Sequence, residues 1–519
     1  MADNDRTWSR LTRRHFVRVL AVCAAVAACV APASGARGPG PGGHDQPTNV
    51  VSMYSTTDYL GATAWWDAGY TGQGIDVAVI DSGVSPVPGL DGPGRVIYGP
   101  DLSLESQSPN LTNLDTYGHG TFMAGLIAGH DATLTEPYSS APDSAYGGMA
   151  PDARIVSLKV AVADGGTDVS QVIAAIDWVV QHAHDPGLNI RVINLSYGTN
   201  STQAYGVDPL AHAAEQAWKH GIVVVVAAGN TGFQRGNGAP GLADPAYDPY
   251  VIAVGASTSM DKKGTRDDAV ATYSASSDRG SSKDPDFVAP GSHVQGLRDT
   301  NSWIDANHPE GIIDERYFRG SGTSEAAAIT SGAVALVLQK YPAMTPDLVK
   351  QFFQTHAVKL RHSGENAQGE GEFRLQRMLD ATPQWSYVGQ SFPASTGTGS
   401  LELSRGQDHL TQNGVALSGE QDIFGHPVDT TALAAGEASG SSWSGGAWNG
   451  SSWSGSSWSG SSWSGSSWSG SSWSGSSWSS LVWSGSSWSG SSWSGSSWSG
   501  SSWSGSSWSG GTWASSEWN

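Results

Sequence analysis

The stretch "IDVAVIDSGV", residues 75–84, is a run of apolar residues that stops at an aspartate and a turn. A short, continuous apolar run bounded by a turn is typical of a strand that is buried on both faces. The same pattern recurs in "ARIVSLKVAVAD" from Ala153, "IRVINLSYG" from Ile190, "IVVVVAAGN" from Ile222 and "YVIAVGAS" from Tyr250. These five runs predict the central strands of one sheet.

Helical patterns separate these strands. In "DVSQVIAAIDWVVQHAH" the apolar residues fall three and four apart, as on one face of a helix, and Asp168 is a candidate N-cap. Further helices are predicted in "PLAHAAEQAWKHG", near Thr323 and near Pro346. Alternating strands and helices indicate an α/β fold, a mostly parallel sheet flanked by helices on both faces. We expect this domain over residues 59–384.

The first residues predict export. Arginines at positions 13 and 14 precede an apolar run from Val17 to Val30, which is too short to anchor the chain in a bilayer. A basic start, an apolar middle and a small-residue end are typical of a secretory signal, and the paired arginines resemble the twin-arginine type. We expect such a signal peptide over residues 1–36 and a linker over residues 37–58.

A lipid anchor is the alternative for the same segment. "VAAC", residues 26–29, resembles a lipoprotein cleavage box, in which Cys29 would carry the lipid at the cell surface. Both cysteines, Cys23 and Cys29, lie in this segment, so we expect no disulfide in the processed protein. No later stretch is apolar and long enough to predict a transmembrane helix.

The chain of 519 residues is acidic. It carries 47 acidic and 27 basic side chains, a formal net charge of −20. An acidic surface repels phosphate backbones, so nucleic acid is not expected as a partner. We interpret the charge as a contribution to solubility.

The end of the chain is a repeat. Tryptophan recurs at every fifth position from Trp443 to Trp518 in the unit Ser-Ser-Trp-Ser-Gly, which defines a tail over residues 436–519. Serine and glycine disfavour helix, and an odd step places successive indoles on opposite faces of a strand. We predict a disordered array whose indoles stack on cell-wall glycans, with a spacer lacking any ligand as the alternative. Residues 385–435 fit either a small β extension or a partly ordered linker.

Four polar residues stand where the predicted elements end or begin. Asp81 and Asn230 end strands, His119 lies between two glycines in "YGHGTFMAGLIAG", and Ser324 precedes a helical run in "GSGTSEAAAITSG". Each has an ordinary interpretation as a turn, loop or capping residue. Parallel strands, however, present their carboxyl ends at one edge of a sheet, where sites are built.

Taken together, these motifs resemble the subtilisin-like (subtilase) family of serine proteases. The matching pieces are "VAVIDSGV", "GHGTFMAGLIAG", "INLSYG", "VVVVAAGNTG", "DFVAPG" and "GSGTSEAAAITSG". The resemblance implies a catalytic triad of Asp81, His119 and Ser324, with the amide of Asn230 stabilising the oxyanion. It also implies a substrate cleft lined by Leu195, Ser196, Tyr197 and Gly198, with Ala228 and Gly229 in a wall of the specificity pocket.

The implied function is a secreted serine endopeptidase that acts on proteins or peptides through an acyl-enzyme. The alternative is a degenerate protease fold that serves as a surface adhesion protein through its tail. Catalysis needs no cofactor. The resemblance implies that calcium could stabilise the fold, but the sequence identifies no ligand loop. "HAHD", residues 182–185, has metal-ligand residue types and is interpreted as the polar end of a helix.

The chain departs from the family pattern after the nucleophile. Glu325, Ala328 and Ile329 stand where the family usually has methionine, proline and histidine. A carboxylate at position 325 would favour protonated His119 and disfavour a nearby oxyanion. The alternative is that it is harmless, since a glutamate in the first helical turn suits the helix dipole. We expect activity with a shifted pH optimum. Residues 37–74 are also too few for the folded propeptide that secreted subtilases commonly carry.

Overall fold

The structure is a computed structural model. It describes residues 52–452, except 109, 143, 233–240, 259–266, 278–282, 408 and 413–414, and four short strands further on. The chain divides into residues 1–47 and 48–519, and everything described here belongs to the second unit. The predicted signal peptide and most of the repeat tail therefore lie outside the described residues, as does most of the predicted linker.

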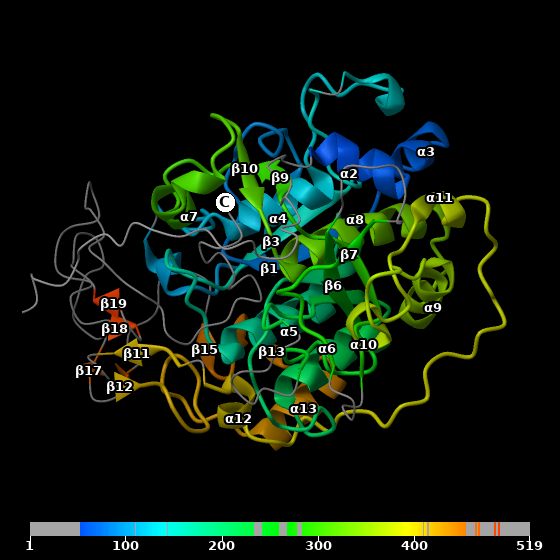
Figure 1. The fold of residues 1–519 in the computed structure, drawn as a ribbon. Coiled ribbons are helices and arrows are strands. Elements are labelled where there is room, and N and C mark those ends of the chain that lie inside the picture. The colour runs from blue at the N-terminus through cyan, green and yellow to red at the C-terminus, as the bar shows by residue number, and fades with distance from the viewer. Residues whose placement is uncertain are drawn as a thin grey trace, which may run out of the picture. The chain divides into compact units, whose positions relative to one another are not determined.

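A single large sheet forms the centre of the second unit (Figure 1). Its strands lie in the order β2-β3-β1-β4-β5-β6-β7, with β8 paired to β6, and all pairs are parallel except β6 with β7. The strands are β1 (Asp76–Asp81), β2 (Val96–Tyr98), β3 (Arg154–Lys159), β4 (Ile190–Leu195), β5 (Val223–Ala227), β6 (Ile252–Thr258), β7 (Ala269–Val270) and β8 (Phe287–Pro290). β1, β5 and β8 are buried along their whole length, which is why their sequences are apolar without alternation.

Helices cover the sheet on both faces (Figure 1). The first layer holds α4 (His119–Ala128) and α8 (Thr323–Lys340), which pack on each other and on the central strands. The second holds α5 (Val169–His182) and α6 (Pro209–Lys219), which also pack on each other. Every residue of α4 is buried, because this helix lies inside the molecule.

The remaining elements surround this body. The helices are α2 (Met53–Leu60), α3 (Ala62–Asp67), α7 (Trp303–Asn307), α9 (Pro346–His356), α10 (Glu365–Gln368), α11 (Leu375–Met378), α12 (Leu401–Arg405) and α13 (Thr430–Ala438). Short 3₁₀ turns are η1 (Leu104–Gln107), η2 (Tyr138–Ser140) and η3 (Pro309–Gly311), and β9 (Val294–Leu297) pairs with β10 (Tyr317–Gly320). No helix among the described residues is long and apolar enough to cross a membrane.

The fold class predicted from the sequence is confirmed. The five apolar runs form β1, β3, β4, β5 and β6, in that chain order. Asp168 caps α5 through a capping box with Gln171, and α8 and α9 begin near the two predicted positions. The edge strands β2, β7 and β8 were not predicted, because each has only two to four residues and too little pattern to stand out.

Residues 385–435, left open by the sequence, pack on the α5–α6 layer (Figure 1). The buried side chain of Arg405 on α12 donates to Asp168, the N-cap of α5, over 2.7 Å. Ser404 donates to Asp208, the N-cap of α6. The extension also holds the two-residue strands β11 (Thr411–Gln412) and β12 (Val415–Ala416). It is thereby tied to the first turns of both helices.

The first units of the repeat tail are ordered against the same layer. β13 (Trp443–Ser444), β14 (Ala447–Trp448) and β15 (Ser451–Ser452) form an antiparallel meander. Trp443 donates to the carbonyl of Ala174 at 2.9 Å, and the fully buried Trp448 donates to the carboxylate of Asp177 at 2.7 Å. These first units are therefore part of the described fold, and most of the predicted disordered array lies outside the described residues. Beyond them the structure describes β16 (Ser462–Trp463), β17 (Ser466–Ser467), β18 (Val482–Trp483) and β19 (Ser486–Ser487).

Candidate active site

Asp81 and His119 meet at one edge of the sheet. Asp81 is the last residue of β1, and His119 is the first residue of α4. The Nδ1 atom of His119 lies 2.9 Å from each carboxylate oxygen of Asp81, and both side chains are fully buried. A carboxylate at Nδ1 fixes the imidazole ring and leaves the proton-accepting role to Nε2. The predicted pairing of these two residues is present.

A second carboxylate supports this pair. Ser82 donates from Oγ to Asp81 Oδ1 at 3.1 Å and lies 2.7 Å from Asp115 Oδ1. Asp115 also accepts from the backbone nitrogens of Gly118 and Thr121, at 2.6 and 2.7 Å. These bonds fix the backbone on both sides of the imidazole and hold the first turn of α4 beside the end of β1.

A buried lysine links the loop after β1 to the loop before α4. Lys159, opposite Asp81 in the sheet, donates from Nζ to the carbonyl oxygens of Ser82 at 2.9 Å and Leu114 at 2.6 Å. Its ammonium group lies 2.9 Å from the carboxylate of Glu105. Because Lys159 and Glu105 are both buried, each compensates the charge of the other in a site with little water.

Ser324 and Asn230 meet through Thr323. Asn230 accepts on Oδ1 from the backbone nitrogen of Thr323 at 2.9 Å and from its hydroxyl at 3.0 Å. These two bonds fix the side-chain amide of Asn230 and leave its Nδ2 donor available for another acceptor. Ser324 is the second residue of α8 and is fully buried. The N-terminal turn of a helix offers backbone N–H groups and a positive dipole to a nearby anion.

The predicted cleft residues lie beside Ser324. Ser196 donates from Oγ to the carbonyl oxygen of Ser324 at 3.3 Å, and Leu195 and Tyr197 are buried on either side of it. A Cβ atom on Gly198 would lie 2.7 Å from Ala243, so only glycine fits there. Gly229 has a φ of +108° and donates to the hydroxyl of Thr323 at 3.1 Å, while Ala228 accepts from Ala243.

The environment raises the pKa of His119. Burial alone lowers it, but the negative charge and hydrogen bond of Asp81 outweigh burial, with smaller contributions from the charges of Glu325 and Asp115. The imidazolium form is therefore stabilised, as a general base requires once it has accepted a proton.

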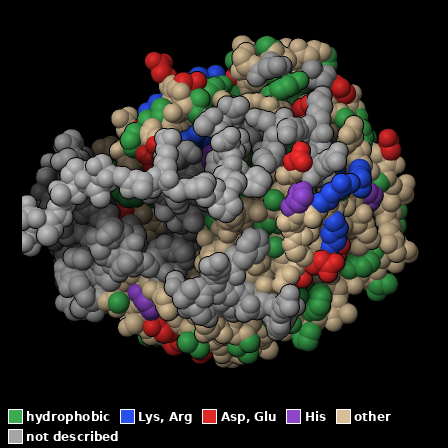
Figure 2. Space-filling view, in the orientation of Figure 1, with side chains coloured by type: hydrophobic (Ala, Val, Ile, Leu, Met, Phe, Trp, Pro, Cys, Tyr) green, Lys and Arg blue, Asp and Glu red, His purple; other side chains and the backbone are tan. Residues whose placement is uncertain are grey.

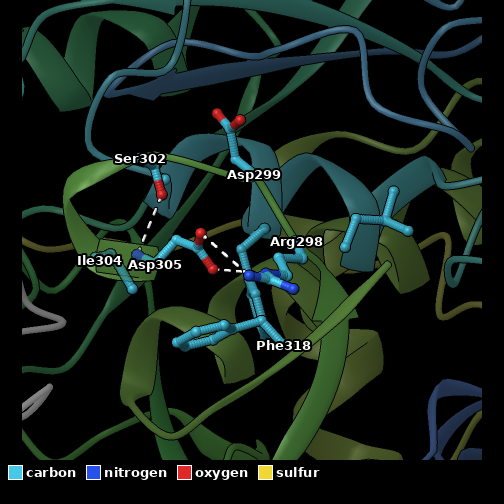
Figure 3. Close-up of a pocket in the computed structure, with 9 residues that line it drawn as sticks. Arg298, Asp299, Ser302, Ile304, Asp305 and Phe318 are labelled. Atoms are coloured by element: carbon cyan, nitrogen blue, oxygen red, sulfur yellow. Dashed lines mark hydrogen bonds and ion pairs between the residues drawn. The ribbon is translucent and has the colours of Figure 1, made fainter. Parts of the chain in front are cut away.

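A small pocket adjoins the first turn of α4 (Figure 3). It is lined by Gly118 and Phe122 at α4 and by residues of β9, β10 and α7. Figure 3 shows two of the lining side chains, Arg298 and Asp305, pointing toward each other, and Arg298 Nε lies 2.5 Å from Asp305 Oδ1. This pocket was not predictable from the sequence, because its residues are far apart in the chain.

Comparison with known proteins identifies the family. The sequence model of the Subtilase family, Peptidase S8, matches residues 72–377. This chain belongs to the subtilase family. It is 34% identical to serine protease AprX of Bacillus subtilis over 313 residues, which cover 60% of this chain and 67% of AprX. It is 29% identical to the minor extracellular protease Epr of the same species, over 58% of this chain and 38% of Epr.

Further subtilases show the same likeness. Subtilisin DY of Bacillus licheniformis is 30% identical over 57% of this chain and 88% of its own length. The crystal structure of fervidolysin from Fervidobacterium pennivorans, a keratinolytic enzyme related to subtilisin, gives a TM-score of 0.49. That likeness has 25% identity and covers 64% of this chain and 46% of fervidolysin. The match of the family model to residues 72–377 confirms the motif-based resemblance to subtilases.

Two residues that hold the Asp81–His119 pair in place, Asp115 and Lys159, were not predicted from the sequence. Asp115 stands four residues before His119, and that acidic residue before "YGHG" is the signal that could have indicated it. Lys159 offered no signal, since a lysine at the end of a strand is normally exposed. Within the described part of the chain, no group of three or more His, Cys, Asp or Glu residues could hold a metal ion.

Proposed function

We propose that this subtilase is a secreted endopeptidase in which Asp81, His119 and Ser324 form the triad. The observation that carries the proposal is the buried bond between His119 Nδ1 and both oxygens of Asp81, in a chain whose serine opens α8. A buried, oriented imidazole of raised pKa beside a helix N-terminus is equipped for acyl transfer.

The reaction follows from these groups. His119 takes the proton of Ser324 through Nε2 while the serine oxygen attacks the peptide carbonyl. The carbonyl oxygen becomes an oxyanion, stabilised by Asn230 Nδ2 and the backbone N–H of Ser324. His119 then protonates the leaving amine, and water hydrolyses the acyl-enzyme by the same steps in reverse. The proposed reaction needs no cofactor.

The substrate is an extended peptide. Leu195 to Gly198 continue β4 past the edge of the sheet, where a peptide can pair with them as an added strand. Ala228 and Gly229 continue β5 beside them and form a wall of the pocket for the side chain before the cleaved bond. Figure 2 shows acidic and basic side chains interspersed on the visible face, which fits a protein substrate better than a polyanion.

Hydrolysis of a quenched-fluorescence peptide library tests the proposal. We expect the full chain to cleave, and the Ser324→Ala and His119→Ala variants to lose at least about 10⁴-fold in kcat. The variants should keep the circular dichroism spectrum of the parent. Equal turnover by the parent and Ser324→Ala would contradict the assignment of the nucleophile.

Export through a twin-arginine-type signal is the second part of the proposal. Its support is the sequence of residues 1–36, and the relative Epr is named an extracellular protease. Replacing both arginines, 13 and 14, with lysine should retain the protein inside the cell. Replacing Cys29 with serine distinguishes the alternative, because a lipid-anchored protein would then leave the membrane fraction.

A further candidate activity is glycan binding by the tail. The specific observation is an indole at every fifth residue from Trp443 to Trp518, of which Trp443 and Trp448 already pack against the body. Many weak stacking contacts add up through multivalency. Co-sedimentation with purified cell walls tests this: binding should decline in steps as units after Ser452 are deleted. Unchanged binding after deletion of all of them would favour a spacer.

A further inference from the structure

Glu325 is a buried carboxyl group next to the nucleophile. It lies in the first turn of α8, directly after Ser324, and is fully buried. Among the described residues, neither of its carboxyl oxygens has a hydrogen-bond partner in another residue. An ionised carboxylate in that state is costly, whereas a protonated one carries no charge and can act as a donor.

The carboxyl group borders the same small space as the oxyanion donors. A Cβ atom built on Gly322 would lie 2.7 Å from Glu325 Oε2, 3.4 Å from Asn230 Nδ2 and 3.7 Å from Ser324 N. Asn230 Nδ2 is itself buried and unpaired among the described residues. An oxygen atom that enters this space therefore meets two N–H groups and the carboxyl group together.

The other side of the carboxyl group offers no compensation for a charge. A Cβ atom on Gly320 would lie 2.4 Å from Glu325 Oε1 and 2.9 Å from the ring of Phe122, so Oε1 faces glycine and aromatic carbon. The titratable groups whose charges act on Glu325 are His119 from α4 and Asp81 from β1. These two groups already compensate each other's charge, because His119 is hydrogen-bonded to Asp81.

We propose that Glu325 acts as a neutral carboxylic acid and donates a hydrogen bond to the oxyanion, beside Asn230 and the Ser324 N–H. This catalytic role rests on the proposed function. As the serine oxygen bonds to the carbonyl carbon, the π electron pair moves onto the carbonyl oxygen and the serine proton moves to His119. Glu325 keeps its proton throughout and stabilises the new charge, as a protonated acid in an apolar site can.

The pKa of Glu325 agrees with this role. Burial raises the pKa of Glu325 to about 7. The charge of His119 and a hydrogen bond from the backbone N–H of Glu325 itself lower it, and the charge of Asp81 raises it. The working state has a proton on Glu325 and none on His119 Nε2. Ionisation of Glu325 as the pH rises removes the donor and places a negative charge beside the oxyanion. Activity must therefore fall on the alkaline side, whereas a conventional triad with a neutral imidazole stays active there.

Two substitutions separate the donor from the charge. Glu325→Gln keeps the shape and a donor but cannot ionise, and Glu325→Met keeps the size without a donor. We expect Glu325→Gln to exceed the parent in kcat/KM at pH 9 by about tenfold or more and to lose the alkaline decline. We expect Glu325→Met to lose about 10²- to 10³-fold in kcat at pH 6, since one oxyanion donor is worth that order.

The parent profile is a test that needs no variant: kcat/KM should decline above pH about 7 to 8, given the pKa of Glu325. A plateau up to pH 10, superimposable profiles of parent and Glu325→Gln, or full kcat in Glu325→Met would each overturn the inference. These results all require an active parent. A parent without any turnover at pH 5 to 9 would instead contradict the proposed function, and the two failures are thus distinguishable.

Discussion

At the scale of single residues, the site consists of buried polar and charged side chains that hydrogen bonds to one another hold in place. Asp81 supports His119, Ser82 bridges Asp81 to Asp115, and each of these contacts is 3.1 Å or shorter. Such orientation is worth most in a site with little water, because the low local dielectric strengthens each contact.

Asp81→Asn tests the orienting role. The amide keeps the shape of the carboxylate but presents the wrong partner to Nδ1 and does not stabilise the imidazolium. We expect kcat for peptide cleavage to fall by about 10⁴-fold at neutral pH, with the thermal midpoint little changed. Retention of more than a tenth of the parent kcat would show that Asp81 is not the orienting residue.

At the scale of elements, Lys159 on β3 joins the loop after β1 to the loop before α4. Breaking a buried ion pair leaves its partner uncompensated, so Lys159→Met should lower the free energy of unfolding by about 3–5 kcal/mol. Urea denaturation measures this. The matched control is Lys359→Met, because Lys359 is 48% exposed and pairs with Glu370 over 3.5 Å. We expect less than about 1 kcal/mol there. Equal losses in both variants would contradict the assigned role of Lys159.

The elements also show what the sequence could predict. Buried parallel strands such as β5 are apolar throughout, and the capping residue Asp168 stands directly before α5, so local pattern was enough. The packing of residues 385–452 was not predictable in the same way. Its contacts, such as Arg405 with Asp168, join residues more than 200 positions apart. A local signal was present in the tail, since Gly445-Gly446 and Asn449-Gly450 break the repeat and supply the positive φ angles of two hairpin turns.

At the scale of the whole molecule, the C-terminal extension joins the α5–α6 layer through buried polar contacts. Trp448 is fully buried and donates to Asp177, and burial together with the charge of Asp177 raises the pKa of Glu437 on α13. Burial raises the pKa of Asp177 to about 7, although its bonds to Trp448 and other side chains lower it. The extension is therefore a structural part of the catalytic unit.

Trp448→Ala tests that role. Removing a fully buried indole and its hydrogen bond should cost about 3–5 kcal/mol, measured by urea denaturation of the full chain. Trp385→Ala is the control, because Trp385 is 53% exposed and should cost less than about 1 kcal/mol. A neutral Trp448→Ala would mean that the first tail units do not contribute to the stability of the body.

Stability should fall as the pH rises. Burial raises the pKa of Asp177 and Glu372 to about 7 and that of Asp248 to about 8. The folded state thus holds protons that the unfolded state releases above pH about 4, so unfolding becomes easier between pH about 4 and 8. The net charge of −20 adds repulsion. We expect an apparent Tm at least about 5 °C lower at pH 9 than at pH 5. A Tm that rises over this range would contradict this view of the buried acids.

The central claim is that His119, held by Asp81, activates Ser324. The most direct measurement is labelling of the full chain with a fluorophosphonate probe between pH 5 and 9, with the labelled residue located by mass spectrometry. We expect one label, on Ser324, which is lost in Ser324→Ala and strongly reduced in His119→Ala. No label at any pH, or a label elsewhere that survives in Ser324→Ala, would contradict it.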